Sequence, residues 1–224
     1  MKIYRLPADC SAILFDMDST LYSNDGYARS QIDLPIERLA VIRGVPFNEM
    51  NDEINQFRKD WAADHDGQEI SLGNIFKTYG ISVRENAKWR EQLYKPEHYL
   101  AEDKQLRSAL ERLVQQYVLA VVTNNPVSVA SRTLSALGVE ELFHVIVGLD
   151  TCGVSKPHEE PFMRAAVLCG AVPEACVSVG DRYDIDIALP LELGMGGILV
   201  DGVDDVYKLP DLFLNRNIAQ GDSI

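Results

Sequence analysis

Cysteine is scarce in this 224-residue sequence, and no two cysteines form a C-x-x-C pair. The four that occur are Cys10, Cys152, Cys169 and Cys176. Four thiols in a chain of this length do not make the disulfide framework of a small secreted domain. We therefore expect reduced and mostly buried thiols, as is typical of a cytoplasmic protein.

Long hydrophobic runs are also absent. The densest apolar runs, 12–15 and 117–122, are far shorter than the roughly 20 residues that a membrane-spanning helix needs. Residues 1–9 lack the uninterrupted apolar segment of a secretory signal. These observations predict a cytoplasmic protein that does not associate with a membrane.

Positive charge is in short supply, because 21 Lys and Arg stand against 34 Asp and Glu, for a formal net charge of −13. Phosphate backbones and anionic membranes repel such a chain, which argues against nucleic-acid partners and peripheral membrane binding. The same repulsion means that a site for a phosphorylated metabolite needs a local cation or a bound metal. The hydrophobic content of 46% and the charged content of 25% are those of an ordinary globular protein, and they leave the oligomeric state open.

Short apolar runs rich in Val and Ile indicate the fold class. They show little polar alternation, which is typical of strands buried on both faces of a parallel sheet. The runs are 12–15, 117–122, 145–147, 176–179 and 197–200. Segments with helical periodicity separate them, and Gly138, Gly170 and Gly194 each follow such a segment, as a left-handed residue does after a helix. The alternation predicts an α/β protein with a doubly wound parallel sheet.

Residues 23–99 interrupt this alternation, because they contain no clear buried strand. Their pattern predicts helices instead, over 28–43, 47–64, 70–78 and 85–93. We interpret the stretch as a helical domain inserted after the first core strand. The core would then comprise residues 1–22 and 100–224.

Polar residues follow the first two predicted core strands. Asp16 and Asp18 follow the first, where an open α/β sheet binds its ligands, although a D-x-D pair alone is as well explained by a solvated loop. Thr123 follows the second and offers a hydroxyl at the same edge. Asn125 and Pro126 are typical of an N-cap and the first helical residue. The start of a helix there would favour an anion, although the pair alone is better explained as a simple capped helix.

Two further segments complete the set. Lys156 precedes Pro157 after the third strand, and a single lysine is usually solvated surface. Asp181 follows Gly180 at the end of the fourth strand, with Asp186 nearby at a helix start. Acids from two strands, a hydroxyl and a lysine would meet at one edge of the sheet. An oxygen-only acidic ligand set suits Mg²⁺, and that dication together with the lysine would offset the acidic field where a phosphate must bind.

Together these segments resemble the four ordered motifs of the haloacid dehalogenase-like hydrolases. The motifs are Asp16-Met17-Asp18-Ser19-Thr20, Thr123-Asn124, Lys156-Pro157, and Gly180-Asp181 with Asp186. The resemblance spans nearly the whole chain, and the inserted segment 23–99 is similar to the helical C1 cap of that family. It implies a Rossmann-like core, and a cap that closes over the substrate.

The resemblance also implies a role for each motif residue. Asp16 would be the nucleophile that forms an aspartyl-phosphate, and Asp18 would be the general acid on the leaving oxygen and then the base for water. The phosphoryl oxygens would be held by Thr123 and the backbone amide of Asn124, and Lys156 would steady Asp16 and the phosphate. Mg²⁺ would be bound by Asp16, the main-chain carbonyl of Asp18, and Asp181. Asp186 would lie just behind these ligands.

The resulting prediction is a Mg²⁺-dependent phosphatase that acts on a small phosphorylated metabolite, with phosphoglycolate-type, sugar-phosphate and nucleotide-monophosphate substrates all open. The run 15–22 is similar to that of pyrimidine 5′-nucleotidase-like members, although Ser19 replaces their usual Asn or Asp. Tyr22, Tyr27 and Arg29, just after the first motif, are candidates to face the crevice through the cap hinge, although hinge loops are often polar for solubility alone.

Three alternatives share the fold. A 2-haloacid dehalogenase usually lacks the second acid that Asp18 supplies. A phosphomutase would use the same residues but return the phosphate to its product. A non-catalytic binding protein would carry a damaged motif, and all four motifs are intact in this sequence.

Overall fold

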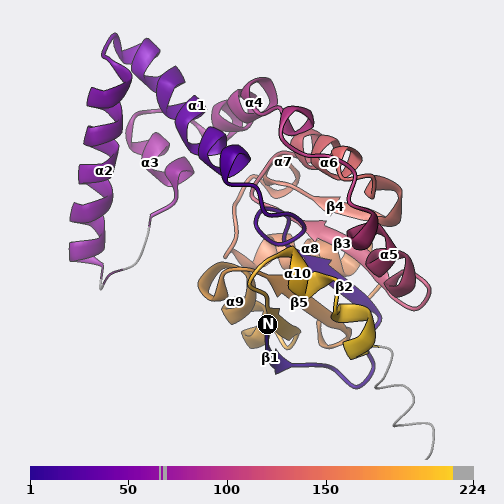
Figure 1. The fold of residues 1–224 in the computed structure, drawn as a ribbon. Coiled ribbons are helices and arrows are strands. Elements are labelled where there is room, and N and C mark those ends of the chain that lie inside the picture. The colour runs from indigo at the N-terminus through magenta and orange to yellow at the C-terminus, as the bar shows by residue number, and fades with distance from the viewer. Residues whose placement is uncertain (66, 68–69, 214–224) are drawn as a thin grey trace, which may run out of the picture. The chain divides into compact units, whose positions relative to one another are not determined.

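The computed structural model describes residues 1–65, 67 and 70–213 (Figure 1). The chain divides into two compact units, Met1–Asn24 with Pro96–Ile224, and Asp25–Lys95. These limits lie close to the boundaries expected from the sequence. The role of the smaller unit as a cap stays a prediction.

The larger unit is built on a six-stranded sheet with the order β1-β6-β5-β2-β3-β4. Its strands are β1 (Lys2–Arg5), β2 (Ala12–Phe15), β3 (Val118–Val122), β4 (Val145–Val147), β5 (Cys176–Gly180) and β6 (Gly196–Leu199). All neighbouring pairs are parallel except β1 with β6, which is antiparallel. The mostly parallel α/β fold is therefore confirmed, and the antiparallel edge strand β1 is an addition to it.

Both faces of the sheet are covered. Neighbouring residues of β2 point to opposite sides of the sheet, and all of them are buried. On one face, Ala12 and Leu14 of β2 join a core cluster with Phe162 and Ala165 of the helix Glu159–Leu168. The helical segments of this unit are η1 (Pro96–His98), α5 (Lys104–Leu113), α6 (Val127–Ala136), η2 (Glu140–Leu142), α7 (Leu149–Cys152), α8 (Glu159–Leu168), η3 (Pro173–Ala175), the π-helical turn η4 (Tyr183–Ile187), α9 (Ala188–Glu192) and α10 (Val203–Val206).

Glycines end three of these helical segments, as the sequence predicts. Gly138, Gly170 and Gly194 follow α6, α8 and α9 with φ of +72°, +67° and +93°. A side chain at these positions would strain the backbone, because the left-handed region is costly for residues with a Cβ atom. Each helix therefore stops at its glycine, and the chain turns back toward the sheet.

The smaller unit is helical. It contains α1 (Asp25–Arg43), α2 (Phe47–Asp64), α3 (Leu72–Thr78) and α4 (Val83–Leu93), which confirms the four helices expected in this segment. Apolar side chains from all four helices form its own core, which includes Leu39, Ile54, Phe76 and Trp89.

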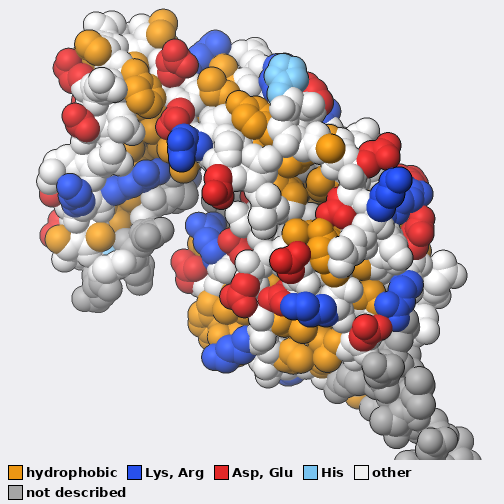
Figure 2. Space-filling model, viewed as in Figure 1, with side chains coloured by type: hydrophobic (Ala, Val, Ile, Leu, Met, Phe, Trp, Pro, Cys, Tyr) orange, Lys and Arg blue, Asp and Glu red, His pale blue; other side chains and the backbone are white. Residues whose placement is uncertain are grey.

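The surface carries mixed charge. Acidic and basic side chains are interspersed on the face that Figure 2 shows, so the acidic excess is not gathered into one patch there. Among the described helices, none combines the length and the apolar character that crossing a membrane requires.

Candidate active site

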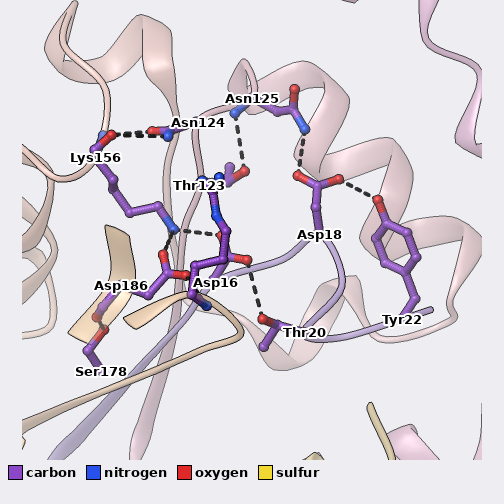
Figure 3. A network of polar contacts seen from close by, with 11 residues as sticks. Asp16, Asp18, Thr20, Tyr22, Thr123, Asn124, Asn125, Lys156, Ser178 and Asp186 are labelled. Carbon is purple, nitrogen blue, oxygen red and sulfur yellow. Dashed lines mark hydrogen bonds and ion pairs between the residues drawn. The ribbon is translucent and has the colours of Figure 1, made fainter. Parts of the chain in front are cut away.

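The loop after β2 begins at the carboxyl edge of the sheet. The backbone N–H of Asp16 donates to the carbonyl of Val179 at 2.8 Å, which extends the pairing of β2 with β5 by one residue. The N–H groups of Thr20 and Leu21 then donate to the carbonyl of Met17, at 3.3 and 2.9 Å, and close a tight turn. This turn places the two predicted carboxylates at the centre of a polar network (Figure 3).

Lys156 joins two of the predicted acids in a buried ion cluster. Its Nζ lies 2.6 Å from Oδ1 of Asp16 and 2.7 Å from Oδ1 of Asp186. The exposed fraction of the side chain is 2% for Lys156, 11% for Asp16 and 2% for Asp186. Burial by itself lowers the pKa of Lys156, but the two carboxylates outweigh that effect and raise this pKa above its ordinary value. Lys156 is therefore a charged group of the site and not solvated surface.

Asn124 fixes the backbone of this lysine. Its side-chain oxygen accepts the N–H of Lys156 at 2.7 Å, and its side-chain nitrogen donates to the carbonyl of Lys156 at 3.3 Å. The two bonds tie the loop after β3 to the loop between α7 and α8, and they give the Asn124 side chain a part that the sequence did not predict.

Asp186 is held by two further hydrogen bonds in the turn after β5. The hydroxyl of Ser178 donates to its backbone carbonyl at 2.7 Å, and the N–H of Arg182 donates to its Oδ2 at 3.2 Å. A Cβ atom on Gly180 would lie far inside van der Waals contact with Cβ of Asp186. Only glycine leaves room for Asp186 to reach Lys156, so Gly180 is required by packing.

Asp16, Asp181 and Asp186 form a cluster that could hold a cation. One carboxylate oxygen from each lies within 4.8 Å of the others. Burial raises the pKa of Asp16 to about 7, although Lys156 opposes the shift. Burial together with the charge of Asp186 raises the pKa of Asp181 to about 6. Three carboxylates beside one ammonium leave surplus buried negative charge, which a divalent cation with oxygen ligands would neutralise.

This cluster differs from the predicted ligand set in one respect. The family resemblance implies that Asp186 lies behind the ligands, whereas in the structure its carboxylate is one of the three in the cluster. The side chain of Asp18 is not part of the cluster. That Asp18 contributes its main-chain carbonyl stays a prediction.

The carboxylate of Asp18 has its own hydrogen-bond partners. Oδ2 accepts from Nδ2 of Asn125 at 2.8 Å, and Oδ1 accepts from the hydroxyl of Tyr22. Oγ1 of Thr123 accepts the backbone N–H of Asn125 at 3.1 Å, so all three residues lie near Asp18 (Figure 3). Thr20 donates to Oδ2 of Asp16 at 3.3 Å.

The prediction that Asn125 is the N-cap residue of helix α6 is wrong. The N-cap residue is Pro126 and not Asn125, and helix α6 begins at Val127. Oδ1 of Asp150 accepts the N–H of Val127 at 2.9 Å, so a carboxylate already occupies the position that we expected to favour an anion. The side chain of Asn125 turns toward Asp18 instead of capping the helix. An asparagine before a proline carries no local signal for that contact.

The family model of the haloacid dehalogenase-like hydrolases matches this sequence over residues 10–194. The chain belongs to the haloacid dehalogenase-like hydrolases. The match includes the segments that bring Asp16, Lys156 and Asp181 together, and it confirms the family that the four motifs indicate.

Named relatives of these hydrolases match along most of the chain. The phosphoglycolate phosphatase of Xanthomonas campestris pv. campestris is 30% identical over 199 residues, which cover 84% of this chain and 81% of that protein. The glyceraldehyde 3-phosphate phosphatase of Methanocaldococcus jannaschii is 27% identical over 218 residues, which cover 88% of this chain and 90% of that protein. Two other matches, also to phosphoglycolate phosphatases, span only 28% and 53% of the relatives' length.

Solved structures of the family share the fold. The crystal structure of a HAD phosphatase from Thermococcus onnurineus superposes with a TM-score of 0.61 and covers 91% of this chain and 97% of that one. The sequences are 19% identical, so this likeness shows the fold alone.

Proposed function

We propose that this haloacid dehalogenase-like hydrolase is a Mg²⁺-dependent phosphatase that forms an aspartyl-phosphate on Asp16. The contrast between Asp16 and Asp18 carries the proposal. Asp16 lies in the cation-binding cluster beside Lys156, whereas Asp18, two residues later, is held by two neutral donors outside that cluster. Two carboxylates in different environments suit the different roles of nucleophile and general acid.

The chemistry divides into two steps. In the first, a carboxylate oxygen of Asp16 attacks phosphorus, the bond from phosphorus to the leaving oxygen breaks, and Asp18 gives its proton to that oxygen. In the second, Asp18 takes a proton from water as the water oxygen attacks phosphorus. The bond from phosphorus to Asp16 then breaks and inorganic phosphate leaves.

The other predicted residues supply positive charge and hydrogen bonds. Lys156 lies close enough to Asp16 to hold its carboxylate and to attract the transferring phosphoryl group. We assign phosphoryl contacts to the hydroxyl of Thr123 and the backbone N–H of Asn124. Mg²⁺, held by Asp16, Asp181 and the carbonyl of Asp18 with Asp186 alongside, would stabilise charge on the phosphoryl oxygens.

The relatives support a small phosphorylated metabolite as substrate. Their names specify phosphoglycolate and glyceraldehyde 3-phosphate, both of which are small phosphate monoesters. They agree with the predicted phosphoric monoester hydrolase and do not favour a dehalogenase. A cytoplasmic location stays a prediction.

The test is release of inorganic phosphate from a panel of phosphorylated metabolites in the presence of Mg²⁺. We expect release with wild type, loss in EDTA, and recovery when Mg²⁺ is added. Asp16→Asn should abolish release, whereas Asp211→Asn, which alters an exposed carboxylate paired with Arg112, should not. Full activity in EDTA would exclude the metal role, and an active Asp16→Asn variant would exclude the nucleophile. An isomerised sugar phosphate without free phosphate would indicate a phosphomutase.

A further inference from the structure

We propose that Tyr22 and Asn125 are positioning residues that aim the carboxyl group of Asp18 at the leaving oxygen. The inference rests on the proposed phosphatase function. It starts from the fact that each oxygen of Asp18 has its own donor, the Tyr22 hydroxyl on Oδ1 and the Asn125 amide on Oδ2 (Figure 3). Donors on both oxygens define the rotation of the carboxyl plane as well as its place.

Both donors are themselves held in place. Tyr22 is 6% exposed and Asn125 is 4% exposed, so neither side chain moves freely in solvent. The backbone of Tyr22 pairs with that of Asp18 in an isolated β-bridge. The backbone of Asn125 donates to Oγ1 of Thr123 and accepts the N–H of Leu149, at 3.1 and 2.9 Å. The contact between Asn125 and Asp18 thus joins two hydrogen-bonded loops that are 107 residues apart in the sequence.

The two donors differ in what they can do during proton transfer. An amide N–H only donates, so Oδ2 of Asp18 remains an acceptor whether or not the group carries a proton. A hydroxyl can donate or accept. The proton of the acid form is therefore placed on Oδ1, where the Tyr22 hydroxyl, which donates to that oxygen in the structure, can turn and accept until the leaving oxygen takes the proton. This arrangement directs one defined oxygen of Asp18 at the substrate.

A positioning role predicts a specific dependence on the leaving group. Phosphate esters of alcohols need a proton on the departing oxygen, whereas p-nitrophenol leaves readily without one. Positioned general acids contribute about 10²–10⁴-fold in rate, and misplacement forfeits part of that. Tyr22→Phe should lower kcat/KM for an alkyl phosphate by about tenfold or more and for p-nitrophenyl phosphate by much less. The ratio kcat/KM reports only steps up to leaving-group departure, so the later hydrolysis of the aspartyl-phosphate does not enter.

The experiment measures kcat/KM for aryl and alkyl phosphates of increasing leaving-group pKa, with saturating Mg²⁺. The variants are Tyr22→Phe, Asn125→Ala, Asp18→Asn, and Asp18→Asn combined with Tyr22→Phe. Tyr207→Phe is the matched control, because it removes a tyrosine hydroxyl that donates to a carboxylate other than that of Asp18, namely Asp103, at 2.5 Å. Thermal melts verify that each variant is folded. If Tyr22→Phe does not fold, Asn125→Ala tests the proposal in its place.

We expect Tyr22→Phe and Asn125→Ala to steepen the dependence of kcat/KM on leaving-group pKa toward that of Asp18→Asn. Tyr207→Phe should keep the wild-type dependence. In the Asp18→Asn background, Tyr22→Phe should cause no further steepening, because the group that it positions is gone. An equal loss for every ester, or an unchanged slope, would overturn the positioning role while leaving the phosphatase assignment intact. A wild-type protein that releases no phosphate from any ester would overturn both.

Discussion

The metal-free protein should lose stability as the pH rises, and Asp16 should cause much of that loss. Burial raises the pKa of Asp16 from an ordinary 3.8 to about 7 in the folded protein, and it raises that of Asp181 to about 6. Between pH 4 and pH 7 the folded state therefore retains protons that the unfolded state has released. Because the folded pKa values are the higher ones, these groups lower the free energy of unfolding as the pH rises through this window.

The magnitude follows from the same pKa values. Each pKa unit corresponds to about 1.36 kcal/mol, so ionising Asp16 costs the folded state at most about 4 kcal/mol at pH values above 7. Asp16→Asn removes this cost, and an amide oxygen in its place can still accept a hydrogen bond from Lys156. In EDTA at pH 7.5, the variant should be more stable than wild type by up to about 4 kcal/mol. At pH 4.5 the two should differ little, because Asp16 is then protonated in the folded wild type.

Urea unfolding at pH 4.5, 6.0 and 7.5 measures this difference, first in EDTA and then with excess Mg²⁺. A cation that binds only the folded state raises the free energy of unfolding. Mg²⁺ should therefore restore the stability of wild type at pH 7.5, and it should stabilise Asp16→Asn less. Asp211→Asn, at an exposed carboxylate, should follow wild type throughout. The reasoning fails if wild type and Asp16→Asn keep a constant difference across pH in EDTA, or if Mg²⁺ stabilises both equally.

Three other substitutions or treatments have defined outcomes. Ser19 has a φ of +60°, a backbone conformation that costs most residues about 1 kcal/mol but suits Asn better. Ser19→Asn should therefore raise the free energy of unfolding, measured in urea titrations, by about 0.5 kcal/mol. A lower free energy of unfolding would contradict the strain. Gly180→Ala should destabilise the fold by about 1–3 kcal/mol and reduce phosphate release, because the new Cβ displaces Asp186. An unchanged melting temperature and an unchanged rate of phosphate release would disprove the clash. Burial raises the pKa of Cys169 to about 11 and of Cys176 to about 12. Both thiols should therefore react slowly with a disulfide reagent at pH 8 until urea unfolds the protein. Fast labelling of the folded protein would refute this.

Local patterns in the sequence predict most of the fold. Strands β3, β4 and β5 are short runs rich in Val, and this apolar character is a property of neighbouring residues. Strand β1 escapes this reasoning. It is four residues long and mostly exposed, and it becomes a strand only by pairing with β6, where Lys2 lies opposite Leu199. A strand that depends on a partner nearly two hundred residues away has no local signature.

The predicted site residues come together, but several of their partners were not foreseeable. Asn125 before Pro126 has the local pattern of a helix cap, and the helix N-terminus could have been completed by that side chain. In the folded chain Asp150 takes the position instead, and the Asn125 amide reaches Asp18. Tyr22 contacts the same carboxylate from the opposite side. Which of several possible acceptors a polar side chain selects depends on where the other loops lie.

By itself, the sequence determined which chemical groups stand at the ends of the parallel strands, because strand ends and motif spacing are properties of neighbouring residues. Acids after β2 and β5 and a lysine after β4 are therefore evident from the order of the amino acids alone. The tertiary structure alone decided how those groups balance one another. Lys156 is an ordinary lysine in the sequence, and it becomes a buried cation between Asp16 and Asp186 only when three separate loops converge. Charge balance depends on desolvation and on distances of a few ångströms between remote segments, and no local pattern encodes either.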